Sequence, residues 1–108
     1  MMKFILLTFI FSSSVFSSTI KPDPGLYYCK TGNEESICDQ IVKPYFNEQG
    51  LSAITVEYVG ECGSMGPYSY YCQDDICEDP GLRFEFKDSK HYRWENKQYG
   101  FVCEFEKK

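Results

Sequence analysis

Six cysteines in a short chain that begins with a leader-like segment constrain the fold more than any other feature of this sequence. Lys3 precedes an uncharged apolar run from Phe4 to Phe11, and the small residue Ser17 follows it. This order of regions predicts a signal peptide over residues 1–17, because the apolar run is too short to span a bilayer. Residues 18–108 are then expected to form a single secreted domain.

The cysteines predict disulfides and not a metal site. A domain of this length buries only about 60 to 65% of its unfolded surface, so it usually needs covalent staples. The closest cysteine spacing, four residues between Cys72 and Cys77, does not fit a zinc pair, and His91 stands alone. We expect three disulfides of open connectivity and no metal or cofactor. The cysteines are Cys29, Cys38, Cys62, Cys72, Cys77 and Cys103.

The charge argues against nucleic-acid partners. The formal net charge is −5 at pH 7, and acidic residues are spread along the chain. Such a surface repels phosphate backbones, and neither a basic amphipathic helix nor a membrane-inserting segment follows the leader. The acidic stretch from Gln73 to Asp79 lacks the ligand spacing of a calcium loop, which favours a solvated loop.

The order of elements predicts an α+β fold. Asn33 can cap a helix whose apolar residues recur at three- and four-residue spacing from Ile37 to Tyr45, and Pro44 should end or kink it. The other regular segments are rich in β-formers, so we expect one helix packed on an antiparallel sheet. The expected strands cover residues 26–29, 54–59, 68–72, 82–86, 91–95 and 98–106.

The last three of these strands allow a prediction of register as a meander. Alternation places Leu82, Phe84 and Phe86 on one face, and a three-residue loop at 88–90 would set Phe86 opposite Tyr92 and Phe84 opposite Trp94. The other face then pairs Glu85 with Arg93 and Arg83 with Glu95.

A two-residue turn at Asn96 and Lys97 would set Trp94 opposite Tyr99 and Tyr92 opposite Phe101. Cys103 then points into the core. It should bridge to the N-terminal part of the domain, and Cys29 on the first strand is the favoured partner.

A first strand with Tyr27-x-Cys29, a single helix, an antiparallel sheet and a late Cys103 resemble the RNase-like secreted effectors of plant-pathogenic fungi, which are similar to guanyl-specific ribonucleases. The resemblance implies a late cysteine that bridges back to the Tyr-x-Cys motif. It also implies a phosphodiester-cleaving cluster, for which Glu57, Arg83 and His91 are the candidates.

The catalytic match is incomplete. Arg83 follows a Pro-Gly turn, as the phosphate-binding arginine of that family does, but Glu95 stands near the position of the family's late histidine. The alternative interpretation of this sheet face is structural, with cross-strand ion pairs Arg83–Glu95 and Glu85–Arg93. We favour the structural interpretation, because the register that packs the aromatics produces these pairs without further assumption.

The segment from Gly63 to Tyr71 carries the candidate binding residues Met65, Tyr68, Tyr70 and Tyr71. Tyrosine and methionine are common in protein-protein contacts. An internal strand with alternating packing explains the same pattern, so both interpretations stay open.

The sequence therefore predicts a secreted, disulfide-rich interaction protein without catalytic activity. We expect a monomeric virulence effector that binds a host protein, outside the host cell or after translocation into it. The alternatives are a ribonuclease-like phosphodiesterase and a secreted toxin or antimicrobial protein.

Overall fold

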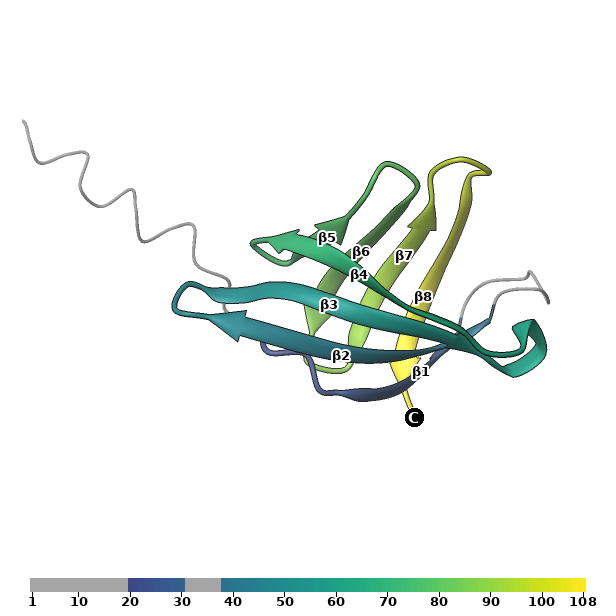
Figure 1. Ribbon diagram of the computed structural model, residues 1–108, viewed down its shortest axis with the longest axis horizontal. Coiled ribbons are helices and arrows are strands. Elements are labelled where there is room, and N and C mark those ends of the chain that lie inside the picture. The colour runs from purple at the N-terminus through teal and green to yellow at the C-terminus, as the bar shows by residue number, and fades with distance from the viewer. Residues whose placement is uncertain (1–19, 31–37) are drawn as a thin grey trace, which may run out of the picture.

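The computed structural model describes residues 20–30 and 38–108, which form an antiparallel closed barrel of eight strands (Figure 1). Neighbours in the barrel are also neighbours in the chain, and β1 pairs with β8 to close it. The strands are β1 (Gly25–Cys29), β2 (Asp39–Asn47), β3 (Gly50–Val59), β4 (Met65–Gln73), β5 (Ile76–Glu78), β6 (Leu82–Asp88), β7 (His91–Asn96) and β8 (Phe101–Lys107), with a 3-10 turn, η3 (Gly60–Cys62), between β3 and β4.

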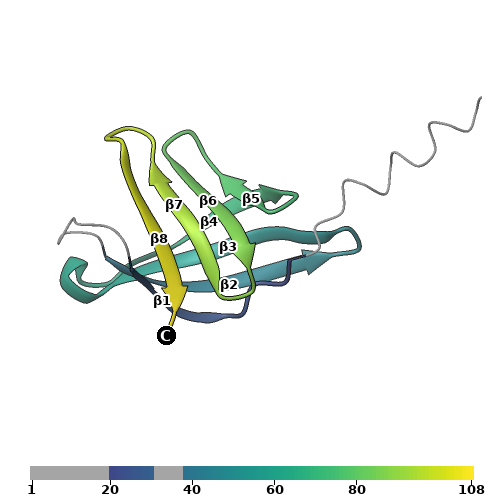
Figure 2. The ribbon, with the colours of Figure 1, turned by 180° about the vertical axis from the view of Figure 1, so that it is seen from behind.

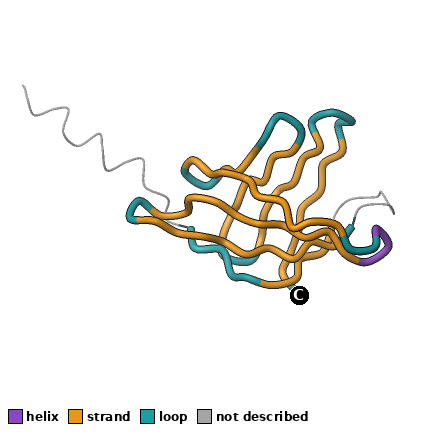
Figure 3. Tube along the Cα trace, viewed as in Figure 1, coloured by secondary structure: helices purple, strands orange, loops and turns teal. Residues whose placement is uncertain are grey.

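The predicted α+β fold is wrong. Residues 39–45, expected to lie in the helix, belong to β2, and η3 is the only helical segment within the described residues (Figure 3). Gln40 and Val42 are buried while Lys43 is exposed, so burial in this segment follows the two-residue alternation of a strand. Ile41, Val42 and Tyr45 are β-formers, and Pro44 disfavours a helix interior more than it disfavours this strand. The start of the expected helix, residues 31–37, lies outside the described residues.

A long hairpin replaces the expected helix. β2 and β3 pair from Asp39 with Val59 to Asn47 with Gly50, and only Glu48 and Gln49 separate the strands. The Asn47 side chain accepts a hydrogen bond from Gln49 N, and Gly50 has a φ of 115°, as a tight turn requires. The turn residues Asn47 and Gly50 were the sequence signal for this hairpin.

The expected β6–β7 register is confirmed. Phe86 lies opposite Tyr92 and Phe84 opposite Trp94, and on the other face Glu85 meets Arg93. Arg83 likewise lies opposite Glu95, also as expected. The pairing shifts between Phe86 and Asp88, so the strands need only two linking residues where the sequence predicted three.

The expected β7–β8 register is wrong by four residues on β8. Trp94 pairs with Cys103, not Tyr99, because the connection runs over residues 97–100. The Asn96 side chain accepts hydrogen bonds from Gln98 N and Tyr99 N, and Gly100 adopts a positive φ of 77°. An even shift keeps the same residues of the strand inward, so Cys103 still points into the core.

Aromatic side chains fill one end of the barrel. Tyr92 is fully buried and stacks on Phe105 at 5.2 Å between ring centroids. Tyr27 contacts the Tyr92 ring from β1 at 5.0 Å, and its hydroxyl donates to the Asp23 and Ser89 carbonyls. These contacts join β1 to β7 and β8. Figure 2 shows these three strands from behind. The buried apolar residues are Tyr27, Val42, Leu51, Ile54, Val56, Tyr58, Tyr70, Cys77, Phe84, Phe86, Tyr92, Trp94, Cys103 and Phe105.

Three disulfides staple the barrel, in agreement with the expected cysteine-rich, disulfide-bonded chain. Cys29 on β1 is bonded to Cys103 on β8, the pair that the sequence favoured. Cys38 joins Cys62 across the ends of β2 and β3, and Cys72 joins its register partner Cys77 on β5. The predicted acidic loop is therefore interrupted by a short strand, β5, whose Cys77 is fully buried.

A pocket in the mouth of the barrel as the candidate site

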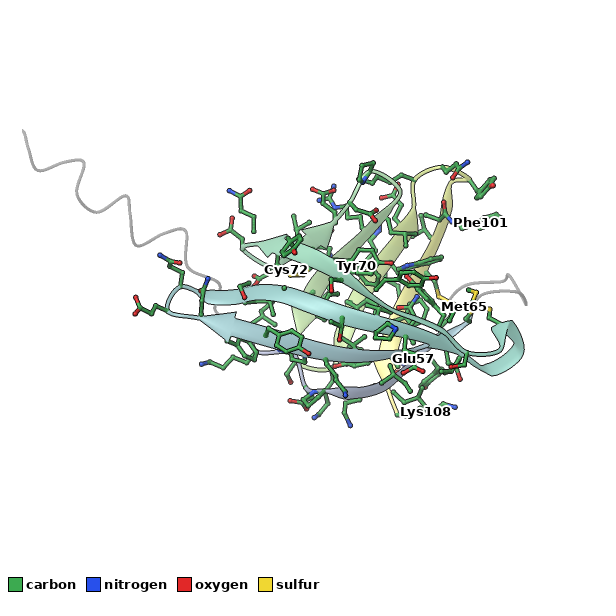
Figure 4. All side chains as sticks on the ribbon, viewed as in Figure 1. Glu57, Met65, Tyr70, Cys72, Phe101 and Lys108 are labelled. Atoms are coloured by element: carbon green, nitrogen blue, oxygen red, sulfur yellow. A yellow bond between two sulfur atoms is a disulfide. The ribbon has the colours of Figure 1, made fainter. Side chains whose placement is uncertain are left out.

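One end of the barrel opens into a pocket of about 460 Å³. It lies where β2, β6 and β8 begin and where β3 and β7 end, because consecutive antiparallel strands bring these termini to the same end. The lining side chains are mostly the inward-pointing members of the same alternating rows that form the core at the other end. In Figure 4, Met65 and Phe101 lie toward the right of the barrel, with Tyr70 further in.

The walls of the pocket are mainly apolar. Tyr99 and Tyr68 at the rim are 66% and 49% exposed, whereas Tyr58 and Tyr70 are buried. Cys38, Met65 and Leu82 add apolar surface between the rings. The aromatic lining residues are Tyr58, Tyr68, Tyr70, Trp94, Tyr99 and Phe101.

A few polar groups stand in this apolar wall. The hydroxyl oxygens of Tyr58 and Tyr70 lie 2.9 Å apart, and burial raises the pKa of both phenols above the ordinary value. Gln40 is 1% exposed, and its carbonyl accepts a hydrogen bond from the Tyr92 hydroxyl. Trp94 Nε1 is buried without a hydrogen-bond acceptor among the described residues.

The four candidate binding residues predicted from the sequence lie on two different faces of the barrel wall. Met65, Tyr68 and Tyr70 line the pocket. Tyr71, next in the chain, points the other way and is 77% exposed on the outer face of β4. The segment is a strand from Met65 onward, which fits the internal-strand interpretation for Tyr70 and the contact-surface interpretation for Tyr71.

The three candidate catalytic residues do not form one cluster. Glu57 lies on β3 and accepts a hydrogen bond from the Ser64 hydroxyl at 3.0 Å. Arg83 is on β6, which β4 and β5 separate from β3 in the barrel. His91 begins β7 at the opposite end of the β6–β7 hairpin from Arg83.

His91 has acidic neighbours of its own. Its Nδ1 is 2.8 Å from Asp88 Oδ1, and its Nε2 is 3.6 Å from Glu106 Oε2. The backbone N–H of Lys90, and then the contact with His91, hold the pKa of the Asp88 carboxyl below its ordinary value. His91 thus belongs to a surface ion-pair group at the β6–β7 turn.

The expected cross-strand ion pairs need a correction. Although Arg83 lies opposite Glu95 in register, its guanidinium is 4.0 Å from Glu85 on the same strand, and Arg93 is 3.3 Å from Glu95. The ion pairs therefore run along each strand. All four side chains are about one-third exposed, so each pair contributes about 0 to 1 kcal/mol at most.

Sequence reasoning missed most of the pocket. Gln40 and Trp94 were assigned to a helix region and to the core, and Leu82, Asn96 and Phe101 were not proposed for binding. The available signal was position along the strands: each lies on the inward row of its strand, near the end at which that strand meets the mouth. That signal becomes visible only once residues 39–47 are read as a strand.

Among residues 20–30 and 38–108, no group of three or more histidine, cysteine or carboxylate side chains is arranged to hold a metal ion. The same described residues contain no helix that is long and apolar enough to cross a membrane.

Comparisons with protein-family models, with curated proteins and with solved structures gave no match. The resemblance to RNase-like effectors therefore stays a prediction, although the helix-on-sheet fold that it implied is wrong.

Proposed function

We propose that this chain is a secreted, disulfide-stapled binding protein without catalytic activity, which takes a small apolar ligand into the mouth of its barrel. The single observation that carries the proposal is the largely aromatic pocket of about 460 Å³ at one barrel end. Ligand pockets typically have volumes of about 300 to 1,000 Å³ and mostly apolar walls with a few polar groups, and barrel mouths are common places for them.

The asymmetry of the barrel supports this proposal. The interior around Tyr92, Phe84 and Phe105 is packed, with all three side chains essentially inaccessible. Toward the mouth the same inward rows line the pocket of about 460 Å³. An eight-stranded barrel is just wide enough for side chains to fill or for one small ligand. The packed end holds the strands in place, and the open end leaves room for a ligand.

The disulfides support the same proposal. Cys38–Cys62 ties the start of β2 to η3 beside the mouth, and Cys38 itself lines the pocket. Cys29–Cys103 fixes β1, the neighbour of β2 in the ring, against β8. A site whose walls are held before the ligand arrives loses less conformational entropy on binding.

Titration with the neutral dye N-phenyl-1-naphthylamine tests the proposal. Its emission rises in apolar surroundings, and Trp94, the single tryptophan of the chain, lines the pocket as an energy donor. We expect saturable binding at one site with energy transfer from Trp94.

A matched pair of variants locates the dye. Met65→Asp places a charge at the mouth and should weaken binding about tenfold or more, because an unpaired carboxylate in an apolar wall is costly. Tyr71→Asp makes a similar change on the outer face of the same strand and should leave the affinity unchanged. Non-saturable binding, or equal weakening by both variants, would reject the mouth as the binding site.

A second candidate function is contact with a host protein through the outer face. Tyr45, Ala53 and Tyr71 lie side by side across β2, β3 and β4, and both tyrosines are more than half exposed. A row of exposed aromatic side chains is typical of contact surfaces. A host protein retained by the wild type and by Met65→Asp, but lost from a Tyr45→Ser, Tyr71→Ser double variant, would support this candidate. A partner lost only from Met65→Asp would contradict it.

A further inference from the structure

We propose that the ligand of the mouth is electrically neutral and presents a hydrogen-bond acceptor, such as a ketone or ester carbonyl, to Gln40 and to the Tyr58–Tyr70 hydroxyl pair. This inference rests on the proposed function and narrows its ligand class. It follows from an inventory of donors and acceptors around the pocket.

Gln40 is the buried polar residue of the described core and part of the pocket wall. Its Oε1 accepts the Tyr92 hydroxyl, which has no other acceptor among the described residues. This fixes the amide orientation and leaves the Nε2 group, with two N–H donors, lacking a hydrogen bond within the described chain. A ligand acceptor placed there would pair a donor group that the described chain leaves without a partner.

The tyrosine pair leaves one more donor. Tyr58 and Tyr70 have one hydroxyl hydrogen each, and their 2.9 Å contact uses one of the two. The second hydroxyl hydrogen has no partner among the described residues. Since burial keeps both phenols protonated at neutral pH, this hydrogen is always present as a donor.

The remaining polar groups of the wall also favour an acceptor. Trp94 Nε1–H is a further donor without a partner in the described residues. Asn96 offers little to a donor on the ligand, since its Oδ1 already accepts the N–H groups of Gln98 and Tyr99. The tyrosine hydroxyls of the wall can either donate or accept, so the N–H groups of Gln40 and Trp94 tip the balance toward an acceptor on the ligand.

The absence of charge decides between a neutral and an anionic acceptor. The described lining residues include no Asp, Glu, Lys, Arg or His, and the chain as a whole carries a formal charge of −5. A buried carboxylate without a cation keeps a large desolvation penalty. A carbonyl accepts the same hydrogen bonds without this penalty.

Three naphthalene probes of nearly equal shape test the inference by equilibrium dialysis against the oxidised protein. They are 2-acetylnaphthalene, which has a ketone, 2-isopropenylnaphthalene, in which a methylene replaces the ketone oxygen, and 2-naphthoate, an anion. We expect the ketone to bind about 3- to 10-fold more tightly than the alkene, which is the net value of about one hydrogen bond, and the naphthoate to bind most weakly.

Gln40→Met removes the amide donors at similar side-chain volume. It should abolish most of the preference for the ketone while the alkene affinity stays within about twofold. Gln73→Met makes the same change at an exposed position of β4 and should keep the full preference. If Gln40→Met does not fold, the comparison of the three probes on the wild type still decides the inference.

The outcomes separate this inference from the proposed function. If none of the three probes binds saturably, the small-ligand site is rejected and the inference falls with it. If ketone and alkene bind equally, if naphthoate binds most tightly, or if the preference survives Gln40→Met, the mouth remains a binding site but the acceptor inference is wrong.

Discussion

The hydroxyls of Tyr58 and Tyr70 meet at 2.9 Å where β3 and β4 reach the mouth of the barrel. Both side chains are buried, so this contact replaces water for two polar groups at once. Tyr58→Phe and Tyr70→Phe should each lower the free energy of unfolding by about 1 kcal/mol, and the double variant by less than the sum. Urea unfolding of the four proteins measures the coupling. Strict additivity would show that the two hydroxyls do not interact.

The three disulfides should differ in their contribution to stability. They close loops with sequence separations of 74, 24 and 5 residues for Cys29–Cys103, Cys38–Cys62 and Cys72–Cys77. Chain entropy then predicts losses of about 4.5, 3.5 and 2 kcal/mol when each pair is replaced by alanine. Denaturant unfolding of the three double variants checks the order. A larger loss for Cys72–Cys77 than for Cys29–Cys103 would contradict it.

Gly66 should tolerate a side chain less well than Gly63. Both have positive φ, 106° and 76°, but a Cβ at Gly66 would stand 2.9 Å from the Val56 carbonyl oxygen, whereas at Gly63 it meets nothing within 4 Å among the described residues. Gly63→Ala should cost about 1 to 2 kcal/mol in backbone strain, and Gly66→Ala at least about 1 kcal/mol more. Thermal unfolding of both variants tests this, and equal losses would exclude a steric contribution.

The Asp88 carboxylate should stabilise the protein above acid pH and not below it. The Lys90 N–H and then His91 lower its pKa in the folded state. A lowered folded pKa gives stability that is present above the unfolded pKa of about 3.9 and is lost as the pH falls through the folded value. Asp88→Asn should therefore reduce the urea midpoint at pH 7 but not at about pH 2. An equal reduction at both pH values would mean that the charge is not the cause.

Four buried tyrosines should resist ionisation in the folded protein. Burial is the largest cause that raises the pKa of Tyr27, Tyr58, Tyr70 and Tyr92. A raised folded pKa gives stability that is present below the unfolded value of about 10 and is lost as the pH rises beyond it. Phenolate absorbance at about pH 11 should be lower for the native than for the urea-unfolded chain, and alkali should then unfold the protein. Equal absorbance in a still-folded sample would contradict the burial.

The pairing of β6 with β7 was predictable because the sequence fixes both of its faces. Aromatic residues such as Phe84 and Trp94 select the inner face, and Glu85 opposite Arg93 satisfies the outer one, so only one register meets both conditions. The β7–β8 register was not predictable from the apolar pattern alone. Pairing Trp94 with Tyr99 or with Cys103, four residues further on, places apolar side chains inward in both cases. The geometry of the loop from Asn96 to Gly100 therefore selects the register, in which Trp94 pairs with Cys103.

The helix was predicted over the pattern from Ile37 to Tyr45, because Ile41, Val42 and Tyr45 satisfy a helical spacing as well as an alternating one. Their tertiary environment decides between the two: β1 and β3 both pair with this segment, and a helix would leave each of those strands without a partner on that side. Gln40 illustrates the cost of this error for the site. On a helix Gln40 would be interpreted as a solvated polar residue, whereas on β2 its amide is buried at the mouth of the barrel.

The pairing of β1 with β8 has a consequence for how this protein meets other chains. Each described strand pairs with a neighbour on both sides, so the strands form a ring. The pairing is partial, because residues 43–47 of β2 have no register partner on β1 and residues 65–70 of β4 have none on β5. A closed ring has no edge strand, which reduces strand addition and the edge-to-edge stacking that leads to fibres, and stretches such as these two are where it could still occur. Partners are therefore expected to recognise mainly side chains, and the molecule should aggregate less readily than an open sheet of the same composition.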